Sequence, residues 1–79
     1  MSTQLPLLGP RHIHLATTAV GMPTKYWPAR TQDQRREGGE LEAHGFGRMR
    51  VTVGLWCFHI TDEEFARLES YIKVREVEP

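Results

Sequence analysis

The stretch between residues 48 and 74 constrains the fold of this chain more than any other part of its sequence. Over residues 49–58, apolar side chains recur at every second position, which is the repeat of an extended strand. Thr61 and Glu64 then supply a hydroxyl and, three residues later, a carboxylate, a spacing typical of the capping box at the start of a helix. Beyond them, an apolar stripe at helical spacing comprises Phe65, Leu68 and Ile72, with Tyr71 beside it. This stretch predicts a long strand followed by an α-helix that packs on a sheet.

The end of the predicted strand is apolar on both faces: Leu55 and Cys57 lie on one, and Trp56, Phe58 and Ile60 on the other. Burial on both faces is expected of a central strand, or of one whose second face is covered by a partner. Just before the strand, Gly45 and Gly47 can adopt positive φ, so we expect a turn or a bulge there.

The first half of the chain predicts less regular structure. Residues 1–10 hold two prolines and a glycine, so we expect an extended N-terminal arm. Arg11–Val20 alternates in polarity and contains β-branched residues, which favours a strand. Residues 21–39 combine glycine, proline and polar side chains and are typical of a long loop. Glu40–Ala43 is a candidate short strand.

A chain of 79 residues is long enough for one domain. The predicted fold class is α+β. Residues 11–79 form a single domain with a small antiparallel β-sheet, one C-terminal α-helix packed on a face, and a long loop over residues 21–39 that contains glycine, proline and arginine. A core of this size supplies only about 3–5 kcal/mol of net stability, so small domains often lean on a partner.

The formal net charge is zero, which argues against a protein that binds nucleic acid by overall basicity. Cys57 is the only cysteine, so an intrachain disulfide and any multi-cysteine metal site are excluded, and a lone thiol in an apolar run indicates a reducing compartment. No apolar stretch reaches the length of a membrane span, and residues 5–8 are too short for the core of a signal peptide. We therefore expect a cytoplasmic protein, or one assembled into a virion, with no membrane partner.

Two pairs of potential metal ligands occur at strand-like spacing. His12 and His14 share a face of one predicted strand, and Cys57 and His59 share a face of another. If these strands pair antiparallel, the four side chains converge as zinc ligands. The alternative is that Cys57 continues a core face and that the histidines form ordinary surface hydrogen bonds. Since no short metal motif is present, we favour this alternative and expect neither a metal nor another cofactor.

His44 stands next to a glycine-containing turn, a position that suits a catalytic base. No Ser-His-Asp order accompanies it, no pair of carboxylates marks a cleft, and the thiol of Cys57 belongs to the predicted core. An enclosed substrate pocket is also hard to build in so short a chain. We therefore expect no catalytic residues and no enzymatic activity.

The residues that most suggest a function lie in the predicted loop and arm. The candidate partner-binding residues are Tyr26, Trp27, Arg30, Arg35 and Arg36 in the loop, with Leu5, Leu7 and Leu8 in the arm. Tryptophan, tyrosine and arginine dominate the energetics of protein interfaces. The same composition suits stacking on bases and contacts to phosphates. A third interpretation is that Tyr26 and Trp27 fold back and cover the core.

A short strand, Met49 to Val53, enters the capped helix through a run from Ile60 to Tyr71 that ends in Leu-Glu-Ser-Tyr. This arrangement resembles part of the minor tail proteins of long-tailed phages. The resemblance covers residues 49–72, and the glycine-containing turn and second sheet that follow in that family have no counterpart here. It implies a virion component that docks to other subunits, and it transfers no catalytic residues.

Together these features predict a non-enzymatic protein-binding module, a small structural component of a larger complex such as a phage virion tail. Its partners are then other protein subunits, in an oligomer or a hetero-complex. Two alternatives remain open. The loop over residues 25–36 suits a nucleic-acid-binding accessory protein. Acidic positions of the C-terminal helix suit a small phage-type inhibitor that occludes a host complex by mimicking phosphate charge: Glu63, Glu69, Glu76 and Glu78.

Overall fold

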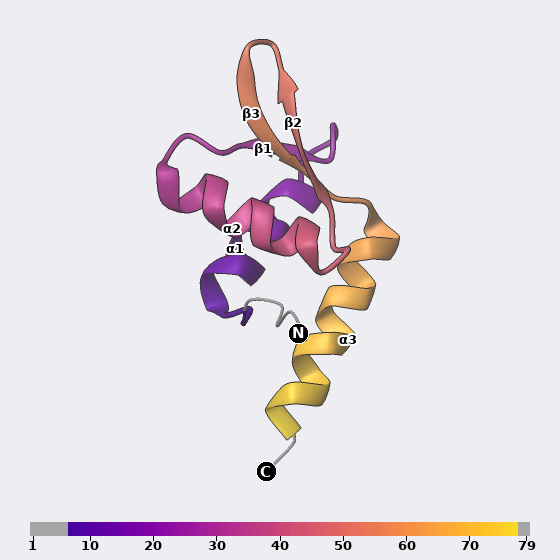
Figure 1. The fold of residues 1–79 in the computed structure, drawn as a ribbon. Coiled ribbons are helices and arrows are strands. Elements are labelled where there is room, and N and C mark those ends of the chain that lie inside the picture. The colour runs from indigo at the N-terminus through magenta and orange to yellow at the C-terminus, as the bar shows by residue number, and fades with distance from the viewer. Residues whose placement is uncertain (1–6, 78–79) are drawn as a thin grey trace.

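The computed structural model describes residues 7–77, with side chains as far as Val74. Within these residues it contains three α-helices and one three-stranded antiparallel sheet (Figure 1). In chain order the elements are α1 (Pro10–Val20), β1 (Tyr26–Pro28), α2 (Gln32–Ala43), β2 (Arg48–Thr52), β3 (Leu55–His59) and α3 (Asp62–Val77). The predicted α+β class is confirmed, whereas the expectation of a single C-terminal helix is wrong. The predicted arm falls mostly on residues 1–6, outside the described residues.

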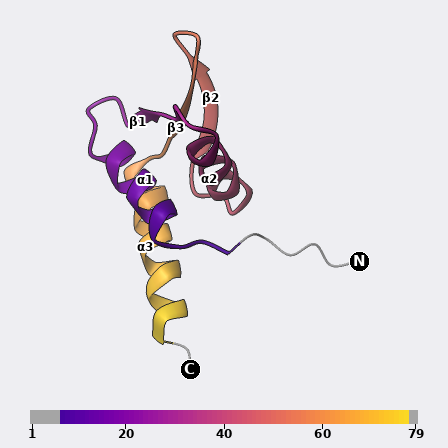
Figure 2. The same cartoon turned by 90° about the vertical axis from the view of Figure 1, so that its left-hand side faces the viewer.

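The strand β3 is central, because the order of the sheet is β1-β3-β2. Phe58 lies opposite both Trp27 and Met49 in the two pairings, so these three side chains share one face of the sheet. The helices α1 and α2 pack against this face, and α3 runs beside α1 (Figures 1 and 2).

The core lies between the covered face of the sheet and the three helices. Its buried side chains include Leu15, Ala16 and Ala19 of α1, Leu41 of α2, Phe58 of β3, Ile60 after β3, and Leu68 of α3. Every helix therefore contributes to one cluster. Complete burial of a large apolar side chain stabilises the fold by about 1.5–3 kcal/mol.

The strand predicted over Arg11–Val20 is wrong, since α1 occupies this segment. Pro10 is the first residue of the helix, where its missing N–H costs no hydrogen bond. The N–H of Gly9 donates to Nδ1 of His12 (3.0 Å), so a histidine completes the cap. Thr17, whose β-branched side chain favours strands, donates its hydroxyl to the carbonyl four residues earlier (2.7 Å) and is thereby accommodated in the helix.

The helix α2 replaces much of the loop predicted over residues 21–39 and the short strand predicted over Glu40–Ala43. It begins with a capping box. Oγ1 of Thr31 accepts the Gln34 N–H (3.1 Å), and the Gln34 side chain accepts the Thr31 N–H (3.2 Å). Gly38 lies inside the helix because a Cβ there would collide with the sulfur of a methionine in β2. Glycine at this position lets α2 approach the sheet closely.

Two features of the sheet also differ from the prediction. Three residues of the predicted loop, Tyr26–Pro28, form the edge strand β1. The predicted long strand is broken by a turn at Val53 and Gly54 into β2 and β3, which form a hairpin. The φ angles of Val53 and Gly54 are 52° and 76°, and two positive values in succession define a type I′ turn.

The predicted C-terminal helix is confirmed together with its cap, but its expected position on a face of the sheet is wrong, because α3 packs against α1. The N–H of Thr61 donates to Oε1 of Glu64 (3.0 Å), and the Glu64 N–H donates to Oγ1 of Thr61 (3.1 Å). Leu68 is fully buried, and Phe65 and Ile72 pack against the core, as the apolar stripe predicts.

The turn expected before β2 is also confirmed. Gly45 and Gly47 have φ angles of 83° and 109°. At Gly47 a Cβ would lie 2.7 Å from the carbonyl oxygen of His59, so the left-handed backbone and the contact with β3 both require glycine.

Candidate functional site

Four large apolar side chains are exposed around the end of the β2–β3 hairpin. The exposed fractions are 59% for Val51, 92% for Val53, 49% for Leu55 and 50% for Trp56. In Figure 1 this hairpin extends beyond the helices at the top of the view. We call these four residues the hairpin patch: Val51 and Trp56 lie on one face of the hairpin, Leu55 lies on the other, and Val53 is in the turn. Exposed apolar side chains that gather in one place mark interaction sites, whereas scattered ones do not.

The helices end short of the hairpin patch. The helix α2 packs over Met49 and Phe58, which face each other across β2 and β3. Val51 and Trp56 form the next pair on the same face, two residues or about 7 Å further along the strands. The expected burial of Leu55 and Trp56 is therefore wrong, whereas the two residues that follow them are buried.

Val53 occupies an unfavourable backbone conformation. Its φ of 52° lies in the left-handed region, which costs an L-residue roughly 1–2 kcal/mol and suits β-branched side chains least. Asparagine, aspartate and glycine are the usual residues at this position of a type I′ turn. Because the side chain of Val53 is almost fully exposed, it returns little packing energy to the monomer. Strained residues of this kind cluster at binding sites.

A pocket of about 430 Å³ opens beside the hairpin patch, and we call it the arginine pocket. Its apolar lining comprises Pro28, Ala29, Leu55 and Trp56, and its charged lining comprises Arg30 and Arg35. The N–H of Ala29 donates to the carbonyl oxygen of Trp56 (2.8 Å), which ties the segment after β1 to the hairpin. The two walls of the pocket are therefore joined by the sheet itself.

The two guanidinium groups of the arginine pocket are held differently. Nη1 of Arg35 donates to the carbonyl oxygens of Ala29 and Arg30, both at 3.4 Å. The backbone N–H of Arg30 donates to Oε1 of Gln34 (2.9 Å), but its guanidinium has no partner within residues 7–77. Arg35 is thus anchored at the wall, and the side chain of Arg30 is open to a ligand.

Arg30 and Arg35 also differ from most other arginines in lacking a carboxylate partner. The arginines that pair with acids are Arg11 with Glu37 (3.4 Å), Arg36 with Asp33 (3.5 Å), Arg48 with Glu64 (3.6 Å) and Arg50 with Glu42 (3.9 Å). In the described part of the chain, Arg30 and Arg35 form no such ion pair, and no acidic residue lines the pocket. The arginine pocket is therefore positively charged without internal compensation.

The aromatic residues of the predicted loop lie elsewhere. Trp27 faces α1 and α2 and packs against the core, which agrees with the interpretation that it covers the core. Tyr26 lies on the opposite face of the sheet, where its ring centroid is 4.8 Å from that of His59. Arg36 is exposed and paired with Asp33, away from the arginine pocket. Of the five loop candidates, the structure brings only Arg30 and Arg35 together in that pocket.

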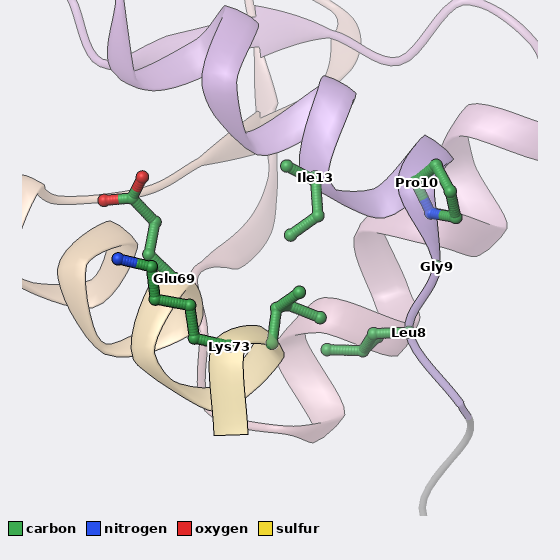
Figure 3. Close-up of a pocket in the computed structure, with 7 residues that line it drawn as sticks. Leu8, Gly9, Pro10, Ile13, Glu69 and Lys73 are labelled. Atoms are coloured by element: carbon green, nitrogen blue, oxygen red, sulfur yellow. The ribbon is translucent and has the colours of Figure 1, made fainter. Parts of the chain in front are cut away.

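The arm residues lie at a separate place. Leu7 is exposed, Leu8 packs against the core, and Leu5 is outside the described residues. Leu8 lines a groove of about 540 Å³ between the start of α1 and α3 (Figure 3). The groove is apolar at its centre, and Glu69 and Lys73 form its edge on α3.

The zinc hypothesis loses its geometric basis, because His12 and His14 lie on a helix and not on a strand. Nε2 of His12 is engaged by Oε1 of Glu40 at 2.8 Å, which links α1 to α2. Cys57 and His59 belong to β3, where the thiol is buried. Among the residues that the structure describes, no group of three or more histidine, cysteine or acidic side chains is arranged to hold a metal ion.

Two titratable groups beside β2 have shifted pKa values. Burial, followed by the positive charges of Arg48 and Arg50, lowers the pKa of His59 below its ordinary value of 6.5. For Glu64, burial acts to raise the pKa, but hydrogen bonds from Thr61 and the charge of Arg48 outweigh it and hold the pKa below 4.5. Glu64 thereby ties the start of α3 to β2. Both groups act on the stability of the fold, and neither lines the arginine pocket.

His44 belongs to an aromatic cluster. Its ring stacks on that of Phe46, with 5.9 Å between centroids and 7° between planes, and it tilts against Tyr71 at 5.4 Å. These contacts join the end of α2 to α3.

Sequence reasoning misses the hairpin patch, because a long apolar run with a repeat of two predicts a buried strand. The signal that finds it is Gly54 between two alternating runs, a spacing typical of a two-residue hairpin. Val53 hides this signal, since valine is a poor residue for the first position of such a turn.

No family model, no curated protein and no solved structure matches this chain. The resemblance of residues 49–72 to phage minor tail proteins therefore stays a prediction. Within residues 7–77, no helix combines the length and the apolar composition that crossing a membrane requires.

Proposed function

We propose that this chain is a non-enzymatic protein-binding module that docks onto another protein through the hairpin patch. The observation that carries this proposal is Val53, a strained, β-branched and 92% exposed side chain at the tip of a hairpin. Such a residue stabilises neither the turn nor the core. Its side chain contributes favourable apolar burial to binding once a partner covers it.

The energetics of the hairpin patch support a protein partner. Burial of apolar surface yields about 25 cal/mol per Å², and tryptophan is among the residues enriched at the centres of protein interfaces. The base of the patch is held by the sheet, because Trp56 pairs with Val51 of β2 and its carbonyl oxygen accepts the N–H of Ala29. Little conformational entropy is therefore lost when the hairpin binds.

A protein fits the hairpin patch better than a nucleic acid does. Three of its four residues, Val51, Val53 and Leu55, are aliphatic, and Trp56 alone offers a flat ring on which a base could stack. The net charge of the chain is zero, and four of its arginines already pair with acids. Nucleic-acid affinity falls steeply with salt because counterions are released, whereas apolar burial is far less sensitive. A salt titration therefore separates the two classes of partner.

The proposal includes a role as a component of a larger assembly. The resemblance of residues 49–72 to phage minor tail proteins implies the same role. A domain whose core supplies only about 3–5 kcal/mol gains from a permanent neighbour that covers exposed apolar surface.

The test compares Val53→Asn with Val74→Asn. Val74 is also an exposed valine (59%), but it lies on α3, away from the hairpin. Proteins retained from an extract of the source cells by the wild-type chain and by each variant are quantified. The dissociation constant of the purified partner is then measured by calorimetry. We expect Val53→Asn to weaken binding about tenfold or more, because the partner loses an apolar contact worth about 1.5 kcal/mol, and Val74→Asn to leave binding unchanged.

A partner that binds the wild type and Val53→Asn equally well would contradict docking through the hairpin patch. Far-UV circular dichroism of each variant shows that the fold is retained, so a loss of binding is not a loss of structure. Light scattering of the wild-type chain alone shows whether the partner is a second copy.

A further inference from the structure

We infer that the arginine pocket selects the partner by receiving an apolar side chain flanked by carboxylates, so that the partner presents an acidic peptide segment. This inference rests on the proposed function, because the pocket adjoins the hairpin patch and shares Leu55 and Trp56 with it. It adds a charge requirement, which the hairpin patch alone does not impose.

The apolar part of the pocket suits a side chain of the partner. Its volume of about 430 Å³ lies in the lower part of the range of ligand pockets. Ala29 is buried, Pro28 is part of β1, and the Ala29–Trp56 hydrogen bond of 2.8 Å fixes the distance between the two walls. The half-exposed ring of Trp56 provides a flat apolar wall that an inserted side chain would cover.

The charged part of the pocket suits an anion. Arg35 is oriented by two carbonyl oxygens at 3.4 Å, and both contacts use Nη1, which leaves its other guanidinium nitrogens without a partner among the described residues. Arg30 lies beside it with an unpartnered guanidinium. A planar guanidinium binds a carboxylate through two parallel hydrogen bonds. Two such groups at one apolar pocket therefore match an apolar side chain with an acid on one or both sides.

A peptide carboxylate matches the site better than the phosphates of a nucleic acid. A nucleic acid needs a series of cations along its backbone. The other arginines near the sheet and α2 are already compensated: Arg36 by Asp33, Arg48 by Glu64 and Arg50 by Glu42. Of the arginines in residues 26–59, only Arg30 and Arg35 lack a carboxylate partner, and this local positive charge matches a short acidic segment.

The experiment uses the full chain labelled with nitrogen-15 and two blocked peptides, Glu-Asp-Leu-Phe-Asp-Glu and its neutral counterpart Gln-Asn-Leu-Phe-Asn-Gln. The chain contains two tryptophans, so its NMR spectrum has two indole N–H signals. Trp56 lines the arginine pocket, whereas Trp27 packs against the core and serves as an internal control. Titration of each peptide gives a dissociation constant from the shift of the Trp56 signal.

Arg30→Gln is the variant of choice because the Arg30 guanidinium has no partner that its loss would leave unsatisfied in residues 7–77. Arg36→Gln is the matched control, since it changes the net charge equally but lies outside the pocket. We expect the wild type to bind the acidic peptide about tenfold more tightly than the neutral one. Arg30→Gln reduces this preference to about threefold or less, and Arg36→Gln leaves it unchanged.

Equal affinity of the wild type for the two peptides overturns the inference, as does the absence of a Trp56 shift at millimolar acidic peptide. A short oligothymidylate that shifts the Trp56 signal at lower concentration than the acidic peptide also overturns it, in favour of nucleic acid. These failures differ from failure of the proposed function. If Val53→Asn abolishes partner binding while both peptides bind equally, docking through the hairpin patch stands and only the acidic preference falls.

Discussion

Replacement of Val53 by asparagine should make this protein more stable, although it removes an apolar side chain. The φ of Val53 is 52°, in the left-handed region of the turn between β2 and β3. Asparagine adopts this region readily because its short polar side chain forms local hydrogen bonds, whereas valine is among the residues least suited to it.

The magnitude follows from two terms. The left-handed conformation costs an ordinary L-residue roughly 1–2 kcal/mol, and asparagine avoids much of this cost. Val53 is 92% exposed, so the apolar burial lost on substitution is a small part of the 1.5–3 kcal/mol of a fully buried valine, about 0.1–0.2 kcal/mol. The free energy of unfolding should therefore rise by about 1 kcal/mol, which raises the melting temperature by about 4–8 °C in a domain of this size.

The assay is urea unfolding followed by circular dichroism, with Val51→Asn as the control. Val51 is 59% exposed and pairs with Trp56 on an ordinary strand, so its replacement should lower the free energy of unfolding by about 1 kcal/mol. Gly54→Ala tests the turn from its other residue. Because its added Cβ meets no atom within 4 Å, any loss of stability in Gly54→Ala comes from the positive φ of 76° and not from a steric clash. If Val53→Asn lowered stability as Val51→Asn does, residue 53 would not occupy a left-handed turn position, and the reasoning would fail.

Three further predictions concern the fold. Gly39→Ala should stabilise α2 by about 0.5–1 kcal/mol, because an added Cβ meets no atom within 4 Å. Gly38→Ala should lower the free energy of unfolding by about 1–3 kcal/mol, because its Cβ overpacks against the sheet. The difference between the urea midpoints of the two variants measures the close contact between α2 and the sheet. Trp27→Ala should lower the free energy of unfolding by roughly 2–4 kcal/mol, and an unchanged midpoint would show that Trp27 is no part of the core. Acidification should reduce stability in two stages, because lowered pKa values mean that the unfolded chain binds more protons: His59 acts as the pH falls below about 6.5, and Glu64 as it falls below about 4.5. Urea midpoints measured as a function of pH test this prediction. The first loss of stability should be absent in His59→Gln, and the second should be absent in Glu64→Gln.

The helix α3 is predictable because its signals are local and agree with one another. Thr61 and Glu64 cap it, and the apolar stripe that follows has helical spacing, so tertiary contacts only confirm the local preference. The same kind of capping box, Thr31 with Gln34, starts α2. It is hidden by Gly38 and the glycine after it, which lower helix propensity and suggest a loop.

The fold of α2 is therefore a case in which tertiary packing overrides local propensity. Gly38 weakens the helix locally by about 1 kcal/mol relative to alanine, but it allows the helix to approach Met49 and Phe58. This gain depends on residues of the sheet that lie at least eleven positions away in the sequence, so no local pattern shows it. The sequence also does not predict the helix α1, because its cap is formed by Gly9 and His12, a pair that standard capping patterns do not include.

The candidate site was predictable only in its charged half. Arg30 and Arg35 stand out in the sequence, and the structure places both at one pocket. The aromatic half of the prediction chose Tyr26 and Trp27, which lie in the predicted loop, whereas Trp56 is the tryptophan at the pocket. Which of two tryptophans is exposed depends on where α1 and α2 end over the sheet, and that boundary is a property of the packed fold.

Val53→Asn should raise the free energy of unfolding and weaken the binding of a partner. This combination of opposite effects distinguishes a binding residue from a core residue or a neutral surface residue. A core residue loses stability when it is replaced, and a neutral surface residue changes neither property. Val53 adopts an unfavourable backbone conformation in its turn, and its side chain is 92% exposed. In a domain with only a few kcal/mol of net stability, roughly 1 kcal/mol of backbone strain is a substantial fraction. If a partner covers the hairpin patch, as proposed above, the burial of the Val53 side chain would offset this strain.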